Sequence, residues 1–279
     1  MSGAGADGLH LGAIRPAAGG VEASVEVEAA SPWFDGHFPG RPVLPAIAHL
    51  ALAHRLHRAG GGPGELARIE ALRLSGPVGP GELLRAALAA ADGAGRRAIT
   101  QAREAERTPV SRGVLVWSPA PAPVPAGEGA GEPVEPPPGP APRLPHAGPS
   151  LLLEAAARAA PGTALGRGRI PPGHAAATEG RAASWAAVEL AAQLTAVLAG
   201  DGGDGDEPGS APEGYLVRLR NVLLAPAPVA AGEVLLARAV METRSGPLAT
   251  FRFTVSRRAG AAVAAGSLAT FSLRPGPPP

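Results

Sequence analysis

A histidine in a rigid loop is the side chain best suited to chemistry near neutral pH. Residues 34–45 read FDGHFPGRPVLP, so glycines and prolines surround His37. Proline fixes φ, and glycine permits backbone conformations that other residues avoid, so we predict a well-defined loop. An imidazole has a reference pKa of about 6.5 and can act as a base at neutral pH. The alternative is a loop histidine bonded to backbone in a protein that has lost activity.

A glutamate, Glu189, is the second candidate for chemistry. It lies in the apolar run 182–199, among alanine, valine and leucine. Burial among such side chains raises the pKa of a carboxyl group, which would keep Glu189 protonated and able to donate a proton. The alternative is a helix glutamate that reaches solvent or caps a neighbour.

Apolar helices are expected to position both residues. Residues 46–58 follow Pro45, which suits a helix start, and 184–198 are equally apolar on most faces. Such helices must be wrapped by other structure, and Val21–Ala29 and Phe251–Ser256 alternate apolar and polar residues as half-buried strands do. We predict an α+β fold, with a curved antiparallel sheet wrapped around a central helix in each half.

The chain is predicted to contain two copies of one unit. PVGPGELL at 77–84 has a counterpart in PVAAGEVL at 228–235, and residues 66–74 align without gaps to 217–225. Residues 119–142 are rich in proline, glycine and alanine without apolar periodicity, which is typical of a semi-rigid linker. The predicted domains are therefore 1–118 and 143–279, joined by the linker 119–142. The second copy carries an extra acidic, glycine-rich segment, 200–207, which we interpret as a solvated loop.

Composition narrows the function classes. The 279 residues carry a net charge of +1 without a long basic run, which argues against a nucleic-acid or membrane-surface protein. Cysteine is absent, which removes disulfides and zinc–thiolate sites, and His49, His54 and His57 lack a metal-binding spacing, so we expect no metal. The first residues do not resemble a signal peptide, and we expect a cytoplasmic protein.

The first half resembles a known family of enzymes. Gly36-His37-Phe38-Pro39-Gly40, then Pro42-Val43-Leu44-Pro45 and an apolar helix, resembles the hot-dog-fold 3-hydroxyacyl-[acyl carrier protein] dehydratases, and most closely the ApeI-like proteins of aryl polyene biosynthesis. The second half, with Leu144-Pro145-His146, a Trp185 to Gln193 helix and Gly214-Tyr215-Leu216, resembles the companion ApeP-like proteins. The resemblance implies a double hot-dog fold.

In this family, the resemblance implies, each active site takes a histidine from one hot dog and a carboxylate from the helix of the other. The family carboxylate lies fourteen residues after the histidine, a position held here by Ala51. The second half has Glu189 on its helix, but Ala175 stands where its histidine belongs, with His174 one residue out of register. These losses are complementary, so we predict one composite site, with His37 as base and Glu189 as acid.

The resemblance also assigns supporting residues. The backbone N–H at the helix start, which belongs to a glycine in the family, is that of Ala46 here, and the carbonyl that orients the histidine maps onto Val43. Gly40 is grouped with them as substrate-positioning. Side chains expected near the substrate are Phe38, Pro45, Trp33 and Phe34.

The implied reaction converts a 3-hydroxyacyl thioester to the trans-2-enoyl thioester. No cofactor is expected beyond the phosphopantetheine arm of an acyl carrier protein, which would be the partner, and double hot-dog units could associate further. Two other functions stay open: a non-catalytic acyl-binding scaffold, consistent with Ala51 and Ala46, and a thioesterase, with Asp35 as a carboxylate beside His37.

Overall fold

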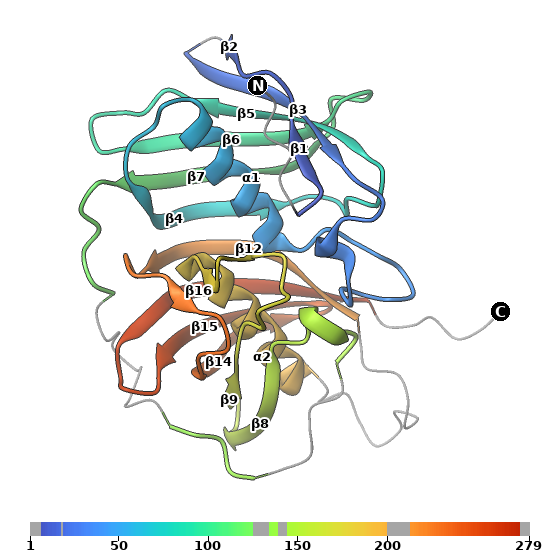
Figure 1. Ribbon diagram of the computed structural model, residues 1–279. Helices are drawn as coiled ribbons and strands as arrows, with labels where there is room; N and C mark the ends of the chain where they lie inside the picture. The colour runs from blue at the N-terminus through green and yellow to red at the C-terminus, as the bar shows by residue number, and fades with distance from the viewer. Residues whose placement is uncertain (1–6, 18, 125–133, 139–143, 200–212, 274–279) are drawn as a thin grey trace, which may run out of the picture.

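The structure, a computed structural model, describes residues 7–17, 19–124, 134–138, 144–199 and 213–273. The first half contains seven strands, one α-helix and one 3-10 turn in these residues (Figure 1). In chain order they are β1 (Leu9–Leu11), β2 (Arg15–Ala17), β3 (Gly20–Val27), η1 (Pro32–Phe34), α1 (Ala46–Ala59), β4 (Glu65–Leu74), β5 (Leu83–Ala89), β6 (Arg96–Arg103) and β7 (Pro109–Ser118).

The second half repeats the order of strands, helix and further strands. Its described elements are η2 (Gly148–Ser150), β8 (Leu153–Ala160), β9 (Thr163–Gly168), β10 (Ala177–Thr178), β11 (Arg181–Ala182), η3 (Ser184–Ala186), α2 (Ala187–Ala199), β12 (Glu213–Leu224), β13 (Val229–Ala230), β14 (Leu235–Ser245), β15 (Leu248–Arg257) and β16 (Ala262–Leu273). The predicted helix 184–198 thus begins with a short 3-10 turn.

One antiparallel sheet runs through both halves. Thirteen described strands join in it, in the order β1-β3-β5-β6-β7-β4-β12-β16-β15-β14-β9-β8, with β2 beside β3. The halves meet where β12 pairs with β4, and Leu219 lies opposite Leu72 in that register. A separate small sheet holds β10, β11 and β13.

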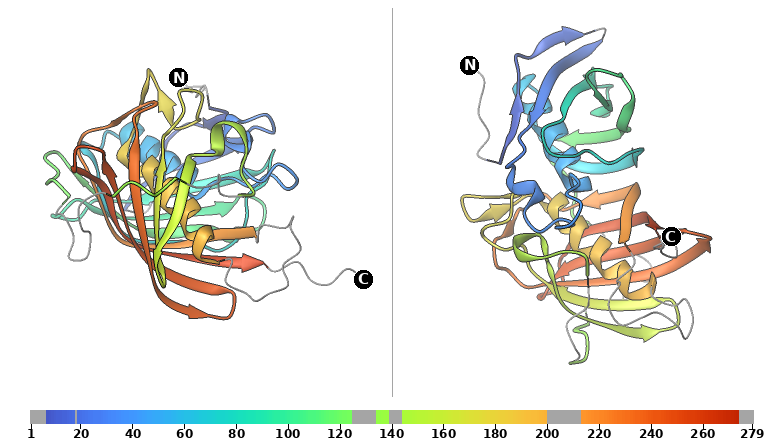
Figure 2. Two further views of the ribbon diagram at one scale, coloured as in Figure 1. Left: turned by 90° about the horizontal axis from the view of Figure 1, so that it is seen from below. Right: turned by 90° about the vertical axis from the view of Figure 1, so that its right-hand side faces the viewer.

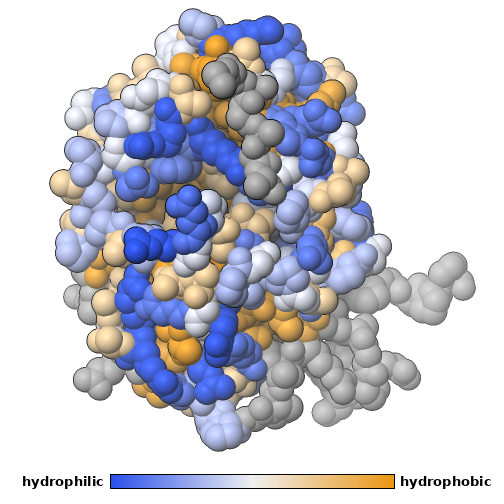
Figure 3. All heavy atoms as spheres, viewed as in Figure 1, coloured by the Kyte–Doolittle hydropathy of each residue, from blue (hydrophilic) through white to orange (hydrophobic). Residues whose placement is uncertain are grey.

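Both helices lie on the same side of this sheet, which curves around them (Figures 1 and 2). Alanine and leucine occupy eight of the 14 positions of α1 and eight of the 13 of α2, and most residues of both helices are buried. Leu50 and Leu52 of α1 and Leu190 and Leu194 of α2 are fully buried. The prediction of an α+β fold with a sheet around a central helix in each half is confirmed. On the face shown in Figure 3, hydrophilic residues predominate, with smaller apolar patches between them.

The linker is described only in part. Within the described stretch 134–138, Glu135 pairs with Arg167 (3.4 Å) and with Arg258, so this part of the linker lies against the second half. The acidic segment 200–207 lies outside the described residues. Neither helix in the described part of the chain is long and apolar enough to cross a membrane.

Candidate functional site

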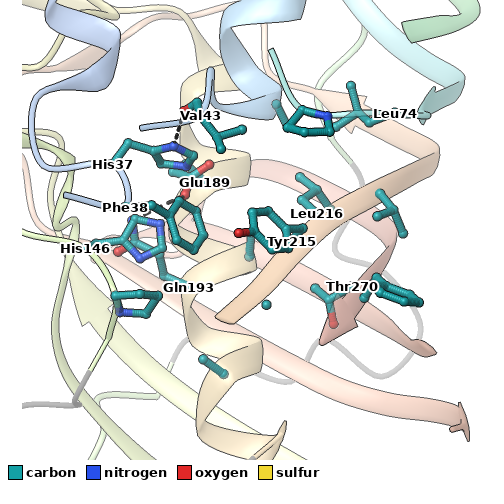
Figure 4. Close-up of a pocket in the computed structure, with 18 of the residues that line it drawn as sticks. His37, Phe38, Val43, Leu74, His146, Glu189, Gln193, Tyr215, Leu216 and Thr270 are labelled. Atoms are coloured by element: carbon teal, nitrogen blue, oxygen red, sulfur yellow. Dashed lines mark hydrogen bonds and ion pairs between the residues drawn. The ribbon is translucent and has the colours of Figure 1, made fainter. Parts of the chain in front are cut away.

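A cavity of about 360 Å³ lies at the junction of the two halves (Figure 4). Its walls come from the loop before α1, the start of α1, one side of α2, the end of β4 with the loop after it, residues 144–146, the start of β12 and the end of β16. His37, His146 and Glu189 project into it, with Phe38 and Tyr215 beside them. The cavity therefore combines side chains from both halves.

His37 is buried and held in one orientation. Its Nδ1 lies 2.5 Å from the carbonyl oxygen of Val43. A carbonyl oxygen can only accept, so Nδ1 carries the proton and Nε2 keeps its lone pair. The ring also packs edge-on against Phe38, with centroids 4.7 Å apart, and Phe38 stacks on Tyr215. The structure thus contains the contact through which the Val43 carbonyl was predicted to orient His37.

The His37 loop is bonded directly to the second half. The backbone N–H of Ala147 donates to the carbonyl of Gly36 (2.8 Å), and His37 and His146 form an isolated antiparallel bridge. The hydroxyl of Ser150 also donates to the carbonyl of Asp35 (2.6 Å). Gly36 has a φ of +75°, a conformation that favours glycine, and a Cβ there would lie 1.8 Å from the Ala147 carbonyl oxygen.

Replacing Gly36 by alanine is expected to lower the free energy of unfolding by about 1–3 kcal/mol, because both the φ angle and the contact with Ala147 oppose a side chain. Gly40→Ala is the matched control: Gly40 is exposed, and its added Cβ would meet nothing within 4 Å. Urea denaturation of both variants measures the difference. Equal stability of the two variants would contradict the close contact between the loops.

Glu189 lies in the first turn of α2, with its side chain 7% exposed. Its Oε1 lies 3.5 Å from Nε2 of His146 and accepts a hydrogen bond from the Gln193 amide (3.4 Å). The same Gln193 amide donates to the carbonyl of Ser150 (2.7 Å), and its oxygen accepts from the backbone N–H of Leu152 (3.0 Å). Gln193 therefore holds residues 150–152, which precede β8, against α2 beside the Glu189 carboxylate.

The charge state of Glu189 differs from the prediction. Burial alone would raise the pKa of Glu189, but the hydrogen bond with His146 and the proximity of His37 outweigh it and lower the pKa to about 2. The start of a helix favours a carboxylate as well. Glu189 is thus ionised at neutral pH, and the expected general acid with a raised pKa is corrected to a carboxylate.

Burial lowers the pKa of His37 to about 4, although the nearby carboxylate of Glu189 opposes the shift. At neutral pH the imidazole is therefore neutral, as a base must be. His49, also in the cavity wall, has its pKa lowered to about 4 by burial. Its Nδ1 bonds Oε1 of Gln101, whose amide donates to the His49 carbonyl (2.9 Å).

These buried histidines predict a loss of stability in acid. Between about pH 6.5 and 4, an unfolded histidine binds a proton, whereas buried His37 and His49 do not. As the pH is lowered through this range, each of the two residues therefore lowers the free energy of unfolding by up to about 1.4 kcal/mol per pH unit. Denaturant unfolding near pH 7, 6 and 5 measures this slope. His49→Asn, which keeps a donor for Gln101, should reduce the slope by one histidine's share; an unchanged slope would contradict this assignment.

His146 was not predicted as a site residue. It lies 109 positions after His37 in sequence, yet its ring centroid is 5.1 Å from that of His37. Its Nδ1 is buried without a hydrogen-bond partner among the described residues, while Nε2 faces Glu189. The usable signal was Pro145 before it and Gly148-Pro149 after it, a rigid setting like that of His37.

The donor atoms of His37, His146 and Glu189 all lie within 4.8 Å of one another, so two imidazoles and a carboxylate could in principle hold a metal ion. Tetrahedral zinc ligands at 2.0–2.1 Å from the ion lie about 3.4 Å apart, so the rings would have to move closer to bind one. The prediction that the site works without a metal stays a prediction.

Other predicted residues divide into two groups. Ala46 begins α1 and, with Phe38 and Val43, lines the cavity. Gly40, Pro45, Trp33 and Phe34 are not among the lining residues, so their contact with the substrate stays a prediction that this cavity does not support. Gly40 is exposed and Pro45 is the residue before α1, whereas Trp33 and Phe34 are buried in the core.

Trp33 has a structural role instead. Its indole N–H donates to the carboxylate of Asp7 (2.9 Å), and its ring packs edge-on against His174, 5.8 Å away. His174 is buried, and its Nδ1 accepts from the backbone N–H of Ala176 (3.0 Å). The α1 position of the family carboxylate holds buried Ala51. The second site expected in a double hot dog therefore has no acid at position 51, and its nearest histidine, His174, packs against Trp33.

Comparisons with known proteins agree with this architecture. Residues 14–114 match the ApeI-like family, described as ApeI dehydratase, and residues 138–275 match the ApeP-like family, described as ApeP dehydratase. No curated protein matches the chain.

Several solved structures with a similar fold are described as dehydratase domains. The bifunctional dehydratase-cyclase domain of ambruticin biosynthesis is 20% identical, with a TM-score of 0.63 over 94% of this chain and 95% of its own. The dehydratase domain of PpsC from Mycobacterium tuberculosis is 15% identical, with a TM-score of 0.64 over 94% and 98%. The erythromycin dehydratase is 21% identical, with a TM-score of 0.57 over 98% and 97%.

The fold is therefore the double hot dog. The chain carries an ApeI-like dehydratase domain followed by an ApeP-like dehydratase domain.

Proposed function

We propose that this cavity dehydrates a 3-hydroxyacyl thioester, delivered on the phosphopantetheine arm of an acyl carrier protein, to the trans-2-enoyl thioester and water. The observation that carries the proposal is that His37 of the first half and Glu189 of the second converge in one cavity, with the start of α1 in its wall. The ApeI-like and ApeP-like matches support the same reaction class.

His37 takes the proton from C2 of the substrate. Because Nδ1–H is bonded to Val43, the lone pair of Nε2 is the one available. As the C2–H bond breaks, negative charge develops on the thioester oxygen. Ala46 offers its backbone N–H in the first turn of α1, where N–H groups lack helical acceptors and the helix dipole favours negative charge. Alanine keeps this N–H in place of the family glycine.

The leaving hydroxyl receives its proton from His37. Glu189 is ionised, so it accepts a hydrogen bond from the 3-hydroxyl and orients it instead of donating a proton. The C3–O bond breaks as the C2=C3 bond forms, and the proton on Nε2 of His37 passes to the departing oxygen to give water. His37 returns to the neutral form, and the carboxylate stabilises the transient imidazolium.

The thioesterase alternative loses its proposed carboxylate. Asp35 is exposed and does not line the cavity, and its backbone carbonyl, which accepts from Ser150, is the part engaged with the site. No observation favours hydrolysis over dehydration.

The test is a steady-state assay of a 3-hydroxyacyl thioester that follows the enoyl product and free thiol together, with and without a metal chelator. Enoyl formation without thiol release, unaffected by the chelator, is the expected result. Thiol release would indicate a thioesterase, and no turnover over several chain lengths would indicate an acyl-binding scaffold.

A further inference from the structure

Three arginines lie directly opposite one another on the outer face of the central sheet. Arg112 of β7 is opposite Arg73 of β4, which is opposite Arg218 of β12. All three are exposed, while Leu72 and Leu219, beside them in sequence, are buried on the inner face. We call Arg112, Arg73 and Arg218 the arginine row; it crosses the seam between the halves.

The row has no counter-charge within the part of the chain that the structure describes. None of its guanidinium groups forms an ion pair or hydrogen bond there, although other strand arginines do: Arg85 pairs with Glu104 at 2.7 Å and Arg96 with Glu70 at 2.7 Å. Like charges directly opposite each other across strands destabilise a sheet. Three such charges in a chain of net charge +1 therefore carry a cost that packing does not explain.

The row lies next to exposed residues that line the cavity. Arg73 directly precedes residues 74–77, which line the cavity and include exposed Ser75 and Pro77. Arg218 directly follows residues 214–217, which line it from the second half. Exposed Arg41 also lines the cavity and has no ion pair among the described residues. A partner on the row would thus lie beside the entrance.

The opposite end of the same strands lacks this feature. There Arg68 pairs with Glu70 at 3.6 Å and with Asn221, and Leu224 lies opposite Ala264. Exposed Arg220 of β12, opposite Ala71, also has no ion pair among the described residues, so the unpaired arginines of these strands lie toward the end that holds the His37–Glu189 cavity. Because the unpaired arginines lie toward the same end of the strands as the His37–Glu189 cavity, we infer a function connected with that cavity.

We propose that the arginine row is the docking surface for an acidic protein, the carrier that delivers the thioester. The proposal rests on the proposed function and deepens it. Carboxylates of the carrier pair with the guanidinium groups, which steer the encounter and orient the arm toward the entrance. These pairs are exposed to solvent, so the contact weakens as salt is added.

The test compares two substrates in the variant R73Q/R112Q/R218Q of the full chain. The probes are a 3-hydroxyacyl group on an acyl carrier protein of bacterial fatty-acid synthesis and the same group on N-acetylcysteamine. KM for the carrier substrate is expected to rise about tenfold at low salt, with kcat unchanged, while kcat/KM for the small thioester stays the same. The matched control is Arg181→Gln, an exposed arginine on β11 of the separate small sheet.

Two outcomes would overturn the proposal. One is an unchanged KM for the carrier substrate. The other is a lower Tm in the triple variant, which would show that the arginine row is paired with carboxylates of this chain. Relief of like-charge repulsion predicts an equal or higher Tm. If neither substrate turns over, the proposed function fails. Docking is then measured separately, by fluorescence anisotropy of a labelled carrier protein with wild type and with the triple variant. Equal binding to both would overturn the docking proposal.

Discussion

The His37→Asn variant is expected to lose dehydration activity by a factor of about 10³ or more, while it folds as wild type does. Asparagine can place an amide N–H near the position of Nδ1 and keep the bond to Val43, but it has no basic nitrogen where Nε2 lies. The loss therefore isolates the base from its orienting bond. The measurement is kcat on the small thioester, with Tm as the check on folding.

His174→Asn is the matched control for this variant. His174 is also buried near the site, but it packs on Trp33 and accepts from a backbone N–H, a bond that an asparagine oxygen can replace. Its kcat is expected to stay within about twofold of wild type. Comparable losses in the two variants would show that any buried histidine change damages the cavity, and His37 would then lose its role as the base.

The Glu189→Gln variant is expected to lower kcat by a factor of about 10² or more. Glutamine keeps the shape and can still accept from the substrate hydroxyl, but it removes the charge that stabilises the imidazolium of His37. Since the carboxylate is already ionised, kcat/KM of the wild type should be flat from about pH 6 to 8. A glutamic acid with a raised pKa would instead give a declining limb within that range.

Glu189→Asp separates charge from position. Aspartate keeps the charge but withdraws it from the substrate hydroxyl by one methylene, so its kcat should fall between those of the Glu189→Gln variant and wild type, with a flat pH profile. Full activity of Glu189→Gln would contradict a catalytic role for Glu189, and with it the proposal that residues of both halves form the active site.

Local pattern was sufficient for much of the fold. The expected helix start after Pro45 is the observed start of α1. The predicted strand 251–256 lies within β15, and the predicted strand 21–29 overlaps β3 but runs two residues past its end. The internal repeat indicated two similar units, and the packing of these units into one sheet depends on the pairing of β4 with β12. That pairing joins residues about 150 positions apart, which no local pattern specifies.

The site was predictable where a motif carried it and not where only tertiary contact did. Complementary losses at Ala51 and Ala175 indicated that His37 and Glu189 share one site, and the structure brings them together. The ionisation of Glu189 was predicted wrongly because apolar sequence neighbours suggested burial alone. The hydrogen bond with His146, which reverses the direction of the pKa shift, comes from a loop more than forty residues earlier.

The joining of both halves in one chain, through β4 and β12, has a genetic consequence. In a homodimer of single hot dogs, every substitution appears twice, so loss of the helix carboxylate would disable both sites at once. Here the change at Ala51 affects one half and the change at Ala175 the other, so the two losses can fall on the same cavity. Covalent linkage thus allows the two sites to change independently, whereas the symmetry of a homodimer would change both, and the proposed His37–Glu189 site can be kept while its counterpart is lost.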